Sequence, residues 1–498
     1  MLSRHDADVV RRDPALPGLA TLLDPEAFLA ALRPGRPAAP PFAGTLRAAQ
    51  ITYVKYKPGT NCLVGYRLDA AGGPVEVNAT AYRPDARGAL QQARARPAVA
   101  GALGAGGIVL EAGTIVVSVF PDDGKLAALP QLVEADARRG LLCELLPDRP
   151  DLWDGTVRRL TYKPERRYVA QVLAGGEARA VLRVYAAPGY RAARGNGTAL
   201  ASRGRLRLAR RLGRSDRLCS LAFEWLPGHS LSEALADPAR GPRSVAAAGA
   251  ALAELHGQDP QGLASLTRQA EAATLQAVAA GLAVVCPGLA GRAERLAGRL
   301  AARLVDEPAV DRPIHGDFYP QQVLLTDGRV AILDLDEAVR GDPAADLGLF
   351  IAHLEDAALR GQLAGGRVEA LGDALLAGYR LAAHPPVPAQ VELYAAAGLV
   401  RLAPHCFRRR HPDWPARTEA MLERAEALLN RIPTGSLSAA HAAPRPAHRP
   451  QPPAPLLPAS PSTDSGLADR TPSHAGPYAV RPAEGTGADR AARRGQAR

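Results

Sequence analysis

The sequence has few cysteines, few aromatic residues and no long apolar run. Its five cysteines form no CxxC pair and have no histidine at zinc-finger spacing, which argues against a disulfide framework and a structural zinc site. Aromatic residues make up 4% of the chain. No uncharged stretch of about 20 strongly apolar residues occurs, and charged residues such as Arg4 and Asp6 occupy the place of an apolar leader. These absences predict a cytoplasmic protein without a membrane span.

Lysine is also scarce, although the formal net charge is +11. Lysine occurs only at positions 55, 57, 125 and 163, and the remaining positive charge is arginine spread thinly along the chain. A nucleic-acid partner would favour a concentrated basic patch. We therefore expect no nucleic-acid binding. The sequence leaves the oligomeric state open.

The 498 residues divide into segments of different character, and their length suggests about three folded units. The segment 433–498 is rich in Pro, Ala, Ser and Gly without hydrophobic periodicity, which predicts a disordered tail. Ala/Leu-rich helical patterns dominate from 232 to 432 and are interrupted by one strand-rich block at 313–336.

The first 231 residues contain an internal repeat. The sequence LPGL at 16–19 matches LPQL at 129–132 at an offset of 113, and YKP at 56–58 matches YKP at 162–164 at an offset of 106. Phe120-Pro121 then matches Leu226-Pro227, again 106 residues apart. Each copy shows the pattern of three strands, a helix and two strands. Chance similarity in a low-diversity composition is the alternative interpretation.

The strand-rich block carries the residues best suited to chemistry. It reads PIHGDFYPQQVLL, followed by a hairpin turn and GRVAILDLDEA. His315-Gly316-Asp317 follows a first strand, Gln322 stands five residues after the aspartate, and Asp334 ends a hydrophobic strand.

This block resembles the catalytic core of the aminoglycoside phosphotransferase and choline kinase-like family, which has H-G-D-x4-N followed by a strand ending in I-D. The later sequence GDPAADL at 341–347 is similar to the family's G-D-P-x-x-D-L. The resemblance covers about residues 155–432 and implies ATP-dependent phosphorylation of a hydroxyl on a small molecule. It implies that Asp317 is the catalytic base and that Gln322 and Asp334 bind Mg²⁺, with glutamine in place of the family's asparagine.

Further matches lie upstream of the block. The sequence FEWLPGHSLSEAL at 223–235 resembles the family's hinge, and the resemblance implies that backbone groups of Glu224, Trp225 and Leu226 bind the purine of ATP, with GTP an open alternative. LAELH at 252–256 matches the helix that follows the hinge.

The predicted small lobe departs from the family at its phosphate-binding residues. Arg183 occupies the place of a lysine that holds the α and β phosphates, and the helical segment after it contains no Asp or Glu to pair with it. The turn KPERR lacks the usual glycine, so Lys163, or Arg166 and Arg167, are candidates for a phosphate contact and equally for solvated turn residues.

The chemistry of several other residues favours a plain structural role. We interpret His315 as a structural histidine, Asp336 and Glu337 as solvated or helix-capping carboxylates rather than ligands of a second metal, and Arg408 to Arg410 as a basic helix end.

Together these patterns predict an α+β, protein kinase-like two-lobe fold with a tandem-duplicated β-rich small lobe, a helical large lobe and a disordered tail. The expected boundaries are 1–127 for a degenerate duplicate small lobe acting as a cap, 128–228 for the working small lobe, 229–432 for the large lobe and 433–498 for the tail. A pseudokinase, acting as a regulatory or nucleotide-sensing module, is the alternative function. A protein kinase is the weaker rival, because no activation loop fits between Asp334 and Gly341.

Overall fold

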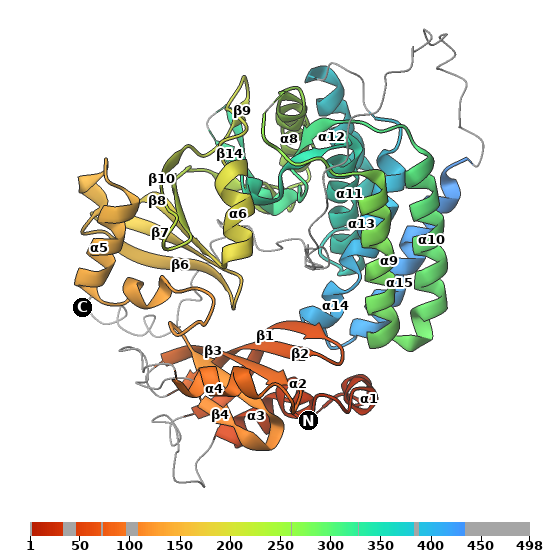
Figure 1. The fold of residues 1–498 in the computed structure, drawn as a ribbon. Coiled ribbons are helices and arrows are strands. Elements are labelled where there is room, and N and C mark those ends of the chain that lie inside the picture. The colour runs from red at the N-terminus through yellow and green to blue at the C-terminus, as the bar shows by residue number, and fades with distance from the viewer. Residues whose placement is uncertain are drawn as a thin grey trace, which may run out of the picture.

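The computed structural model contains two β-rich units and one helical lobe (Figure 1). The structure describes residues 2–32, 46–70, 73–95, 108–259, 261–326, 328–382 and 388–433. The predicted tail lies outside these residues except for Pro433. The α+β class, the two β-rich units and the helical lobe are as predicted from the sequence.

The first unit is a five-stranded antiparallel sheet with the strand order β1-β2-β3-β5-β4. Short helices precede it, and their leucines, such as Leu19 and Leu22, are fully buried against the sheet. The elements are α1 (Arg4–Arg12), α2 (Leu19–Leu23), α3 (Pro25–Leu32), β1 (Leu46–Lys57), β2 (Asn61–Ala70), β3 (Gly73–Tyr82), α4 (Arg87–Ala95), β4 (Ile108–Leu110) and β5 (Ile115–Val119).

The second unit repeats this architecture. Its sheet has the order β6-β7-β8-β11-β10, which is the same arrangement of first, second, third, fifth and fourth strand. The elements are α5 (Ala135–Leu145), β6 (Thr156–Lys163), β7 (Arg167–Ala174), β8 (Glu177–Tyr185), α6 (Ala187–Asn196), β9 (Leu206–Arg207), β10 (Arg211–Ser215) and β11 (Ser220–Glu224). The short strand β9 belongs to a sheet of the helical lobe.

An identical hydrogen-bond arrangement occurs in both units. In the first, Asp13 Oδ2 accepts from the Tyr56 hydroxyl at 2.7 Å and from the Gly59 N–H at 2.8 Å. In the second, Asp123 Oδ2 accepts from the Tyr162 hydroxyl and the Glu165 N–H, both at 2.8 Å. This repeated arrangement supports duplication over chance similarity.

The two units align differently from the sequence match at their beginnings. Asp13 and Asp123 are 110 residues apart, and the same offset relates Leu16 to Leu126, whose N–H groups each bond to the aspartate carbonyl at 3.2 Å. The match of LPGL with LPQL at an offset of 113 is therefore not the structural one. Repeated leucines in similar turns made the shifted match look equally good.

The large lobe consists of helices around a few short strands. Strands β12, β14 and β15 form a sheet with β9, and β13 pairs with β16. The elements are β12 (His229–Ser230), α7 (Leu231–Ala234), α8 (Arg240–His256), α9 (Arg268–Val285), α10 (Ala290–Asp306), β13 (Arg312–Ile314), β14 (Val323–Thr326), β15 (Arg329–Ile332), β16 (Val339–Gly341), α11 (Pro343–Leu359), α12 (Gly365–Ala382), α13 (Val391–Leu402), α14 (His405–Arg408) and α15 (Trp414–Arg431).

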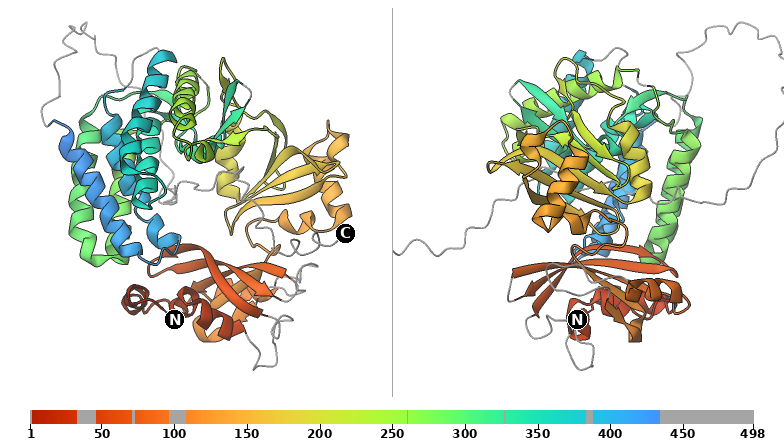
Figure 2. Two further views of the ribbon diagram at one scale, coloured as in Figure 1. Left: turned by 180° about the vertical axis from the view of Figure 1, so that it is seen from behind. Right: turned by 60° about the vertical axis from the view of Figure 1, so that its left-hand side comes forward.

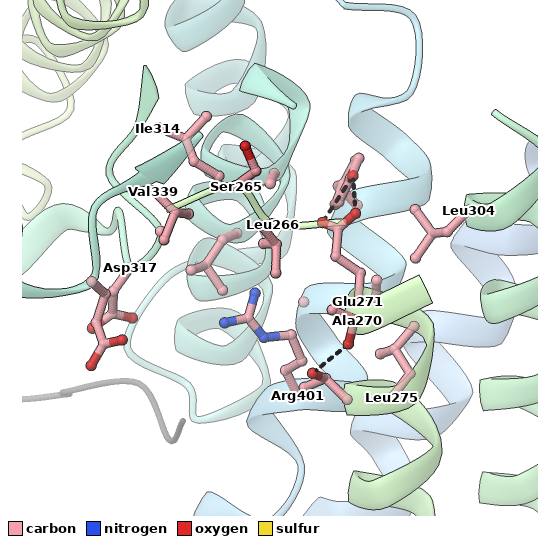
Figure 3. Close-up of a pocket in the computed structure, with 18 residues that line it drawn as sticks. Ser265, Leu266, Ala270, Glu271, Leu275, Leu304, Ile314, Asp317, Val339 and Arg401 are labelled. Carbon is pink, nitrogen blue, oxygen red and sulfur yellow. Dashed lines mark hydrogen bonds between the residues drawn. The ribbon is translucent and has the colours of Figure 1, made fainter. Parts of the chain in front are cut away.

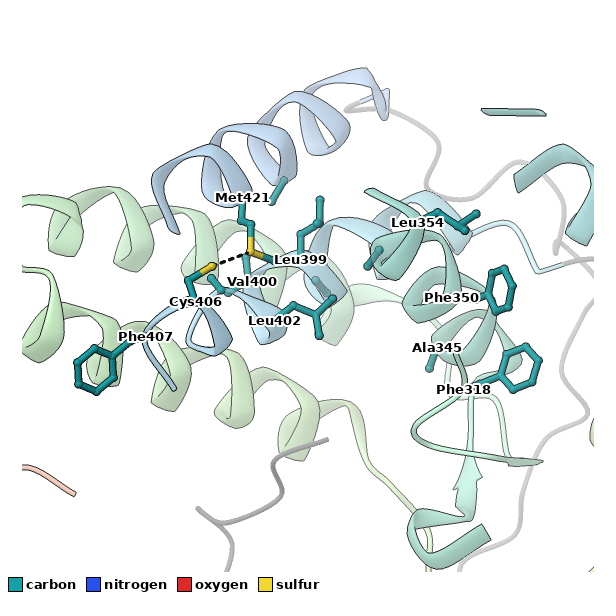
Figure 4. Close-up of a cluster of buried hydrophobic side chains, with 14 of the residues drawn as sticks. Phe318, Ala345, Phe350, Leu354, Leu399, Val400, Leu402, Cys406, Phe407 and Met421 are labelled. Carbon is teal, nitrogen blue, oxygen red and sulfur yellow. Dashed lines mark hydrogen bonds between the residues drawn. The ribbon is translucent and has the colours of Figure 1, made fainter. Parts of the chain in front are cut away.

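The core of this lobe lies between α11, α13, α14 and α15 (Figure 4). Phe318, directly after the predicted catalytic aspartate, stacks on Phe350 of α11 with ring centroids 5.4 Å apart. Burying an aromatic side chain is worth about 2–3 kcal/mol relative to exposure. The catalytic segment is thereby packed against the core of the lobe. None of the helices that the structure describes combines the length and the apolar character needed to cross a membrane.

The first unit spans the other two parts of the molecule (Figures 1 and 2). Arg410 Nη1 of the large lobe donates to Asp6 Oδ1 of α1 at 2.8 Å. On the other side, Arg159 Nη2 of β6 donates to Glu76 of β3 at 2.9 Å. The duplicate therefore contacts both lobes.

Candidate active site

The predicted catalytic loop begins where β13 ends. Gly316 has a φ of +81°, and a Cβ at this position would lie 2.3 Å from the carbonyl oxygen of Glu337. Only glycine is compatible with both the conformation and the close approach. The glycine therefore sets the direction in which the chain presents Asp317, which is 2% exposed.

A buried carboxylate anchors this loop. Asp346 accepts hydrogen bonds from the N–H of His315 at 2.6 Å, from the N–H of Gly316 at 2.9 Å and from His256 Nε2 at 2.9 Å. Burial raises the pKa of Asp346, but the hydrogen bond from His256 and the charges around it outweigh burial and lower the pKa below its ordinary value. The LAELH and GDPxxDL motifs thus meet beneath the loop.

His315 has the structural role predicted for it. Its Nε2 donates to the Leu333 carbonyl at 2.7 Å, and its Nδ1 accepts from the Asp317 N–H at 3.2 Å. Both ring nitrogens are used in bonds to the main chain, so the histidine joins the catalytic loop to the end of β15.

The two predicted metal ligands lie together. Gln322 Nε2 is 3.3 Å from Asp334 Oδ2 and 3.2 Å from the Tyr319 hydroxyl. Asp334 is buried and has a φ of 66°, a left-handed conformation that costs a non-glycine residue of order 1–3 kcal/mol. Such strain is typical of functional positions.

Two buried arginines contact Asp334. Arg167 Nη1 and Nη2 donate to its two oxygens at 2.8 and 3.0 Å, and Arg183 Nη1 donates to Oδ1 at 2.7 Å. Arg183 also lies over the ring of Phe223 at 5.1 Å. Burial lowers the pKa of Arg183, but Asp334, Tyr185 and Asp336 raise it above its ordinary value.

Asp336 shares both arginines, which corrects the interpretation of it as a solvated or capping carboxylate. Its oxygens accept from Arg167 at 2.7 Å, from Arg183 at 3.0 Å and from the Tyr185 hydroxyl at 3.1 Å. The helix α6 indeed offers no acidic partner to Arg183. The partner comes instead from the segment after β15, a pairing that local spacing could not reveal.

Lys163 lies at the end of β6, within reach of this cluster. Burial, and then the charges of Arg167 and Arg166, lower its pKa well below its ordinary value, against the opposing effect of Asp317 and Asp334. It is therefore not a freely solvated turn residue. Glu165, in the same turn, has a φ of 57°, like Gly59 with 62° in the first unit. Glu165 thus adopts the left-handed backbone conformation that glycine has in the corresponding turn of the first unit.

The predicted hinge joins β11 to β12. The N–H of Glu224 bonds to the Arg210 carbonyl at 2.9 Å and that of Trp225 to the Arg179 carbonyl at 3.2 Å. Within the described residues, the Leu226 N–H has no such acceptor. The Leu226 side chain belongs to an apolar cluster with Val169, Val181, Leu324, Ala331 and Leu333, drawn from the small lobe and from β14 and β15.

A cavity of about 220 Å³ opens beside Asp317 (Figure 3). Residues of α9, α11 and α13 line it, together with the segments around β13 and β16. Among its polar residues are Glu271, Glu337 and Arg401. Glu271 and Arg401 could not be predicted as site residues, because they come from α9 and α13, whose sequence patterns predict only helix and burial.

The donor set at Asp334 suits a magnesium ion. Gln322 Oε1 is buried and has no hydrogen-bond partner among the described residues, while Asp334 supplies a carboxylate. Both are hard oxygen donors of the kind that Mg²⁺ prefers. The two arginines occupy the Asp334 oxygens, so the ion has to compete with them.

Comparison with known proteins agrees with this geometry. Residues 149–394 match the family model described as "Phosphotransferase enzyme family". The match covers slightly less than half of the 498 residues. The family resemblance suggested by the sequence motifs is thereby confirmed.

The solved structures similar to this chain include three of interest. A choline/ethanolamine kinase family protein from Mesorhizobium loti is 18% identical with a TM-score of 0.42, over 59% of this chain and 94% of that chain. A choline kinase from Cryptosporidium parvum Iowa II is 11% identical with a TM-score of 0.42, over 60% and 96%. A thermostable mutant of aminoglycoside phosphotransferase APH(4)-Ia is 21% identical with a TM-score of 0.38, over 57% and 95%. A search of curated proteins finds no match.

Proposed function

We propose that the protein transfers the γ-phosphoryl group of ATP to a hydroxyl of a small polar molecule. The observation that carries this proposal is the position of Asp317 in the lining of a cavity, in the same block of the chain as Gln322 and Asp334, which contacts two buried arginines. In the transfer, the acceptor oxygen forms a bond to the γ-phosphorus, and the bond between the γ-phosphorus and the leaving oxygen of ADP breaks. Asp317 accepts the proton of the acceptor hydroxyl.

The small lobe supplies the nucleotide contacts in this proposal. Arg183 and Arg167 exchange the carboxylates of Asp334 and Asp336 for phosphate oxygens, which guanidinium groups bind equally well. Lys163 adds a third positive charge. Gln322 and Asp334 would hold Mg²⁺, which would neutralise phosphate charge.

The hinge contributes the base contact. Among the described residues the Leu226 N–H has no backbone acceptor, which makes it the candidate donor to a purine. The N–H groups of Glu224 and Trp225 already have backbone acceptors, so these two residues shape the hinge. A backbone donor alone favours neither ATP nor GTP, and both belong in the assay.

The first unit, 1–127, is proposed to act as a brace rather than as a second kinase lobe. Thr80 pairs with Leu63 in the same register in which Arg183 pairs with Val169, so no cation stands at that strand position. Its ion pairs to both lobes limit how far the cleft can open. The proposed boundaries of the remaining parts are 128–228 for the working small lobe, 229–432 for the large lobe and 433–498 for a disordered tail.

A turnover assay with Asp317→Asn tests the function. With ATP or GTP, Mg²⁺ and a panel of alcohols, we expect the wild type to form nucleoside diphosphate in step with phosphorylated acceptor. The variant should lose about 10²–10⁴-fold of the rate, the usual contribution of a general base. It should keep the increase in Tm that saturating nucleotide produces.

One observation favours a pseudokinase as the second candidate: both Asp334 oxygens are bonded to arginine. If the protein is a pseudokinase, nucleotide and Mg²⁺ change the Tm of neither the wild type nor Asp317→Asn, and no acceptor is phosphorylated. Binding without turnover in the wild type would also count against the enzyme.

A further inference from the structure

An arginine without a charge partner lines the cavity beside Asp317. Arg401 lies near the C-terminal end of α13, and Figure 3 shows its guanidinium pointing into the cavity from the floor. Its side chain forms no hydrogen bond or ion pair with any residue in the described ranges. A partly buried guanidinium with five unused donors is costly unless a ligand satisfies it.

The carboxylates of the cavity do not supply that partner. Both oxygens of Glu271 lie 3.0 Å from the Tyr394 hydroxyl, and one lies 3.4 Å from Arg268 Nη1. Glu337 Oε1 lies 3.9 Å from Arg166 Nη2. Glu271 is thus already satisfied, so it is a poor receptor for a cationic substrate group.

Arg401 is the one basic side chain among the described residues that line the cavity. An anionic group of a ligand that enters beside Asp317 would therefore meet its charge partner at Arg401.

The size of the cavity restricts the ligand further. Its volume of about 220 Å³ lies below the roughly 300–1,000 Å³ of pockets that hold drug-sized ligands. A compact acceptor fits this space better than a molecule of several rings.

We infer that the acceptor is a small alcohol that also carries an anionic group, a carboxylate or a phosphate, which Arg401 binds while the hydroxyl meets Asp317. The inference rests on the proposed phosphotransferase function. Arg401 would select the substrate by a charge-assisted bond formed as the acceptor enters. An acceptor whose only charge is positive would leave Arg401 unpaired and add to its repulsion.

Matched acceptors test the inference. Gluconate and sorbitol differ in a carboxylate against a hydroxymethyl group, glycerol 3-phosphate and glycerol differ in a phosphate, and glucosamine supplies a cation. We expect the wild type to prefer the better anionic alcohol over its neutral partner at least 10-fold in kcat/KM. Comparing gluconate with glycerol 3-phosphate shows whether the preferred anionic group is a carboxylate or a phosphate.

Substitutions then locate the effect. Arg401→Gln should lower kcat/KM for the anionic alcohol about 10- to 100-fold, the range expected for a hydrogen bond to a charged group. It should leave the neutral partner within about twofold, and Arg401→Lys should restore part of the loss. Arg380→Gln, which changes an exposed arginine on α12, is the matched control.

Calorimetric titration of the same acceptors into Asp317→Asn gives a readout that needs no turnover. Binding of an anionic alcohol that is lost when Arg401→Gln is added supports the inference. Equal binding or turnover of anionic, neutral and cationic alcohols overturns it, as does an anion preference that survives Arg401→Gln. The phosphotransferase proposal would survive such results if nucleotide still raises the Tm and a neutral alcohol is phosphorylated. If nucleotide has no effect on the Tm, the result counts against the proposed function itself.

Discussion

Arg183 Nη1 donates to Asp334 Oδ1 at 2.7 Å, so the side chain expected to bind phosphate is bonded to the carboxylate expected to bind metal. Arg167 makes a second, bidentate contact with the same carboxylate. Together with Asp336, the cluster contains two arginines and two aspartates, so its positive and negative charges balance. Without nucleotide, the small lobe and the catalytic block are therefore held together by their own ionic groups.

Replacing Arg183 by lysine should weaken nucleotide binding although the charge is kept. The lysine ammonium lacks the planar fork of a guanidinium, so it loses part of the contact at a site built around arginine. We expect the KM for the nucleotide to rise about 10- to 100-fold in Arg183→Lys, corresponding to one lost charge-assisted bond. Steady-state kinetics with varied nucleotide measures this, and an unchanged KM would mean that Arg183 does not contact phosphate.

Asp336 should contribute to stability through the two arginines. In Asp336→Asn one of two carboxylates facing Arg167 and Arg183 loses its charge, and we expect the free energy of unfolding to fall by about 1–3 kcal/mol. Glu337→Gln, whose side chain is 36% exposed, is the control and should change it by less than about 0.5 kcal/mol. Denaturant unfolding compares the two, and equal stabilities would show that Asp336 does not compensate buried charge.

Much of the fold followed from local pattern. The repeat was visible because strand periodicity and the YKP turn recur in both copies, and the catalytic block was visible because glycine, aspartate and a buried strand occur at fixed spacing. The two short motifs that carry Asp346 and His256 were visible too, but the bond between these residues was not predicted.

The ionic pairs of the site could not be read in this way. Arg167 and Asp334 are 167 residues apart in the sequence, and nothing in either segment specifies the other. Arg401 resembles any arginine near the end of a helix. The alignment at the start of the repeat failed for a related reason, because leucines at several offsets satisfy the same hydrophobic pattern.

The stability of the protein should depend on pH through His353. Its pKa is lowered in the folded state, mainly by burial, whereas the unfolded chain takes up a proton near pH 6.5. Below this pH the unfolded state binds more protons, so stability falls as pH decreases. In His353→Gln we expect the slope of the unfolding free energy against pH to be smaller by about 1.4 kcal/mol per pH unit in this range.

Chemical denaturation at several pH values between 4.5 and 7.5 checks the slope. His405, whose pKa is also lowered by burial and by Arg408 and Arg409, keeps some pH dependence in the variant. Exposed His229→Gln is the matched control. Parallel curves for the wild type and His353→Gln would show that His353 takes up its proton in both states.

The repeated aspartates allow the two units to be compared directly. Asp13 and Asp123 each hold a tyrosine hydroxyl and the N–H of a β-turn, yet only the second turn lies between Lys163 and Arg167. Asp13→Asn and Asp123→Asn remove the same charge and keep the same shape. We expect both to lower the Tm, because each weakens two hydrogen bonds to a charged group.

Only Asp123→Asn should also weaken nucleotide binding. Its turn carries the left-handed Glu165, which Asp123 stabilises, and loosening it frees the two cations that flank the turn. We expect the nucleotide Kd to rise about 10-fold in Asp123→Asn and to stay within about twofold in Asp13→Asn, measured by isothermal titration. Equal weakening in both variants would instead mean that the first unit participates in nucleotide binding, and that its role extends beyond bracing the two lobes.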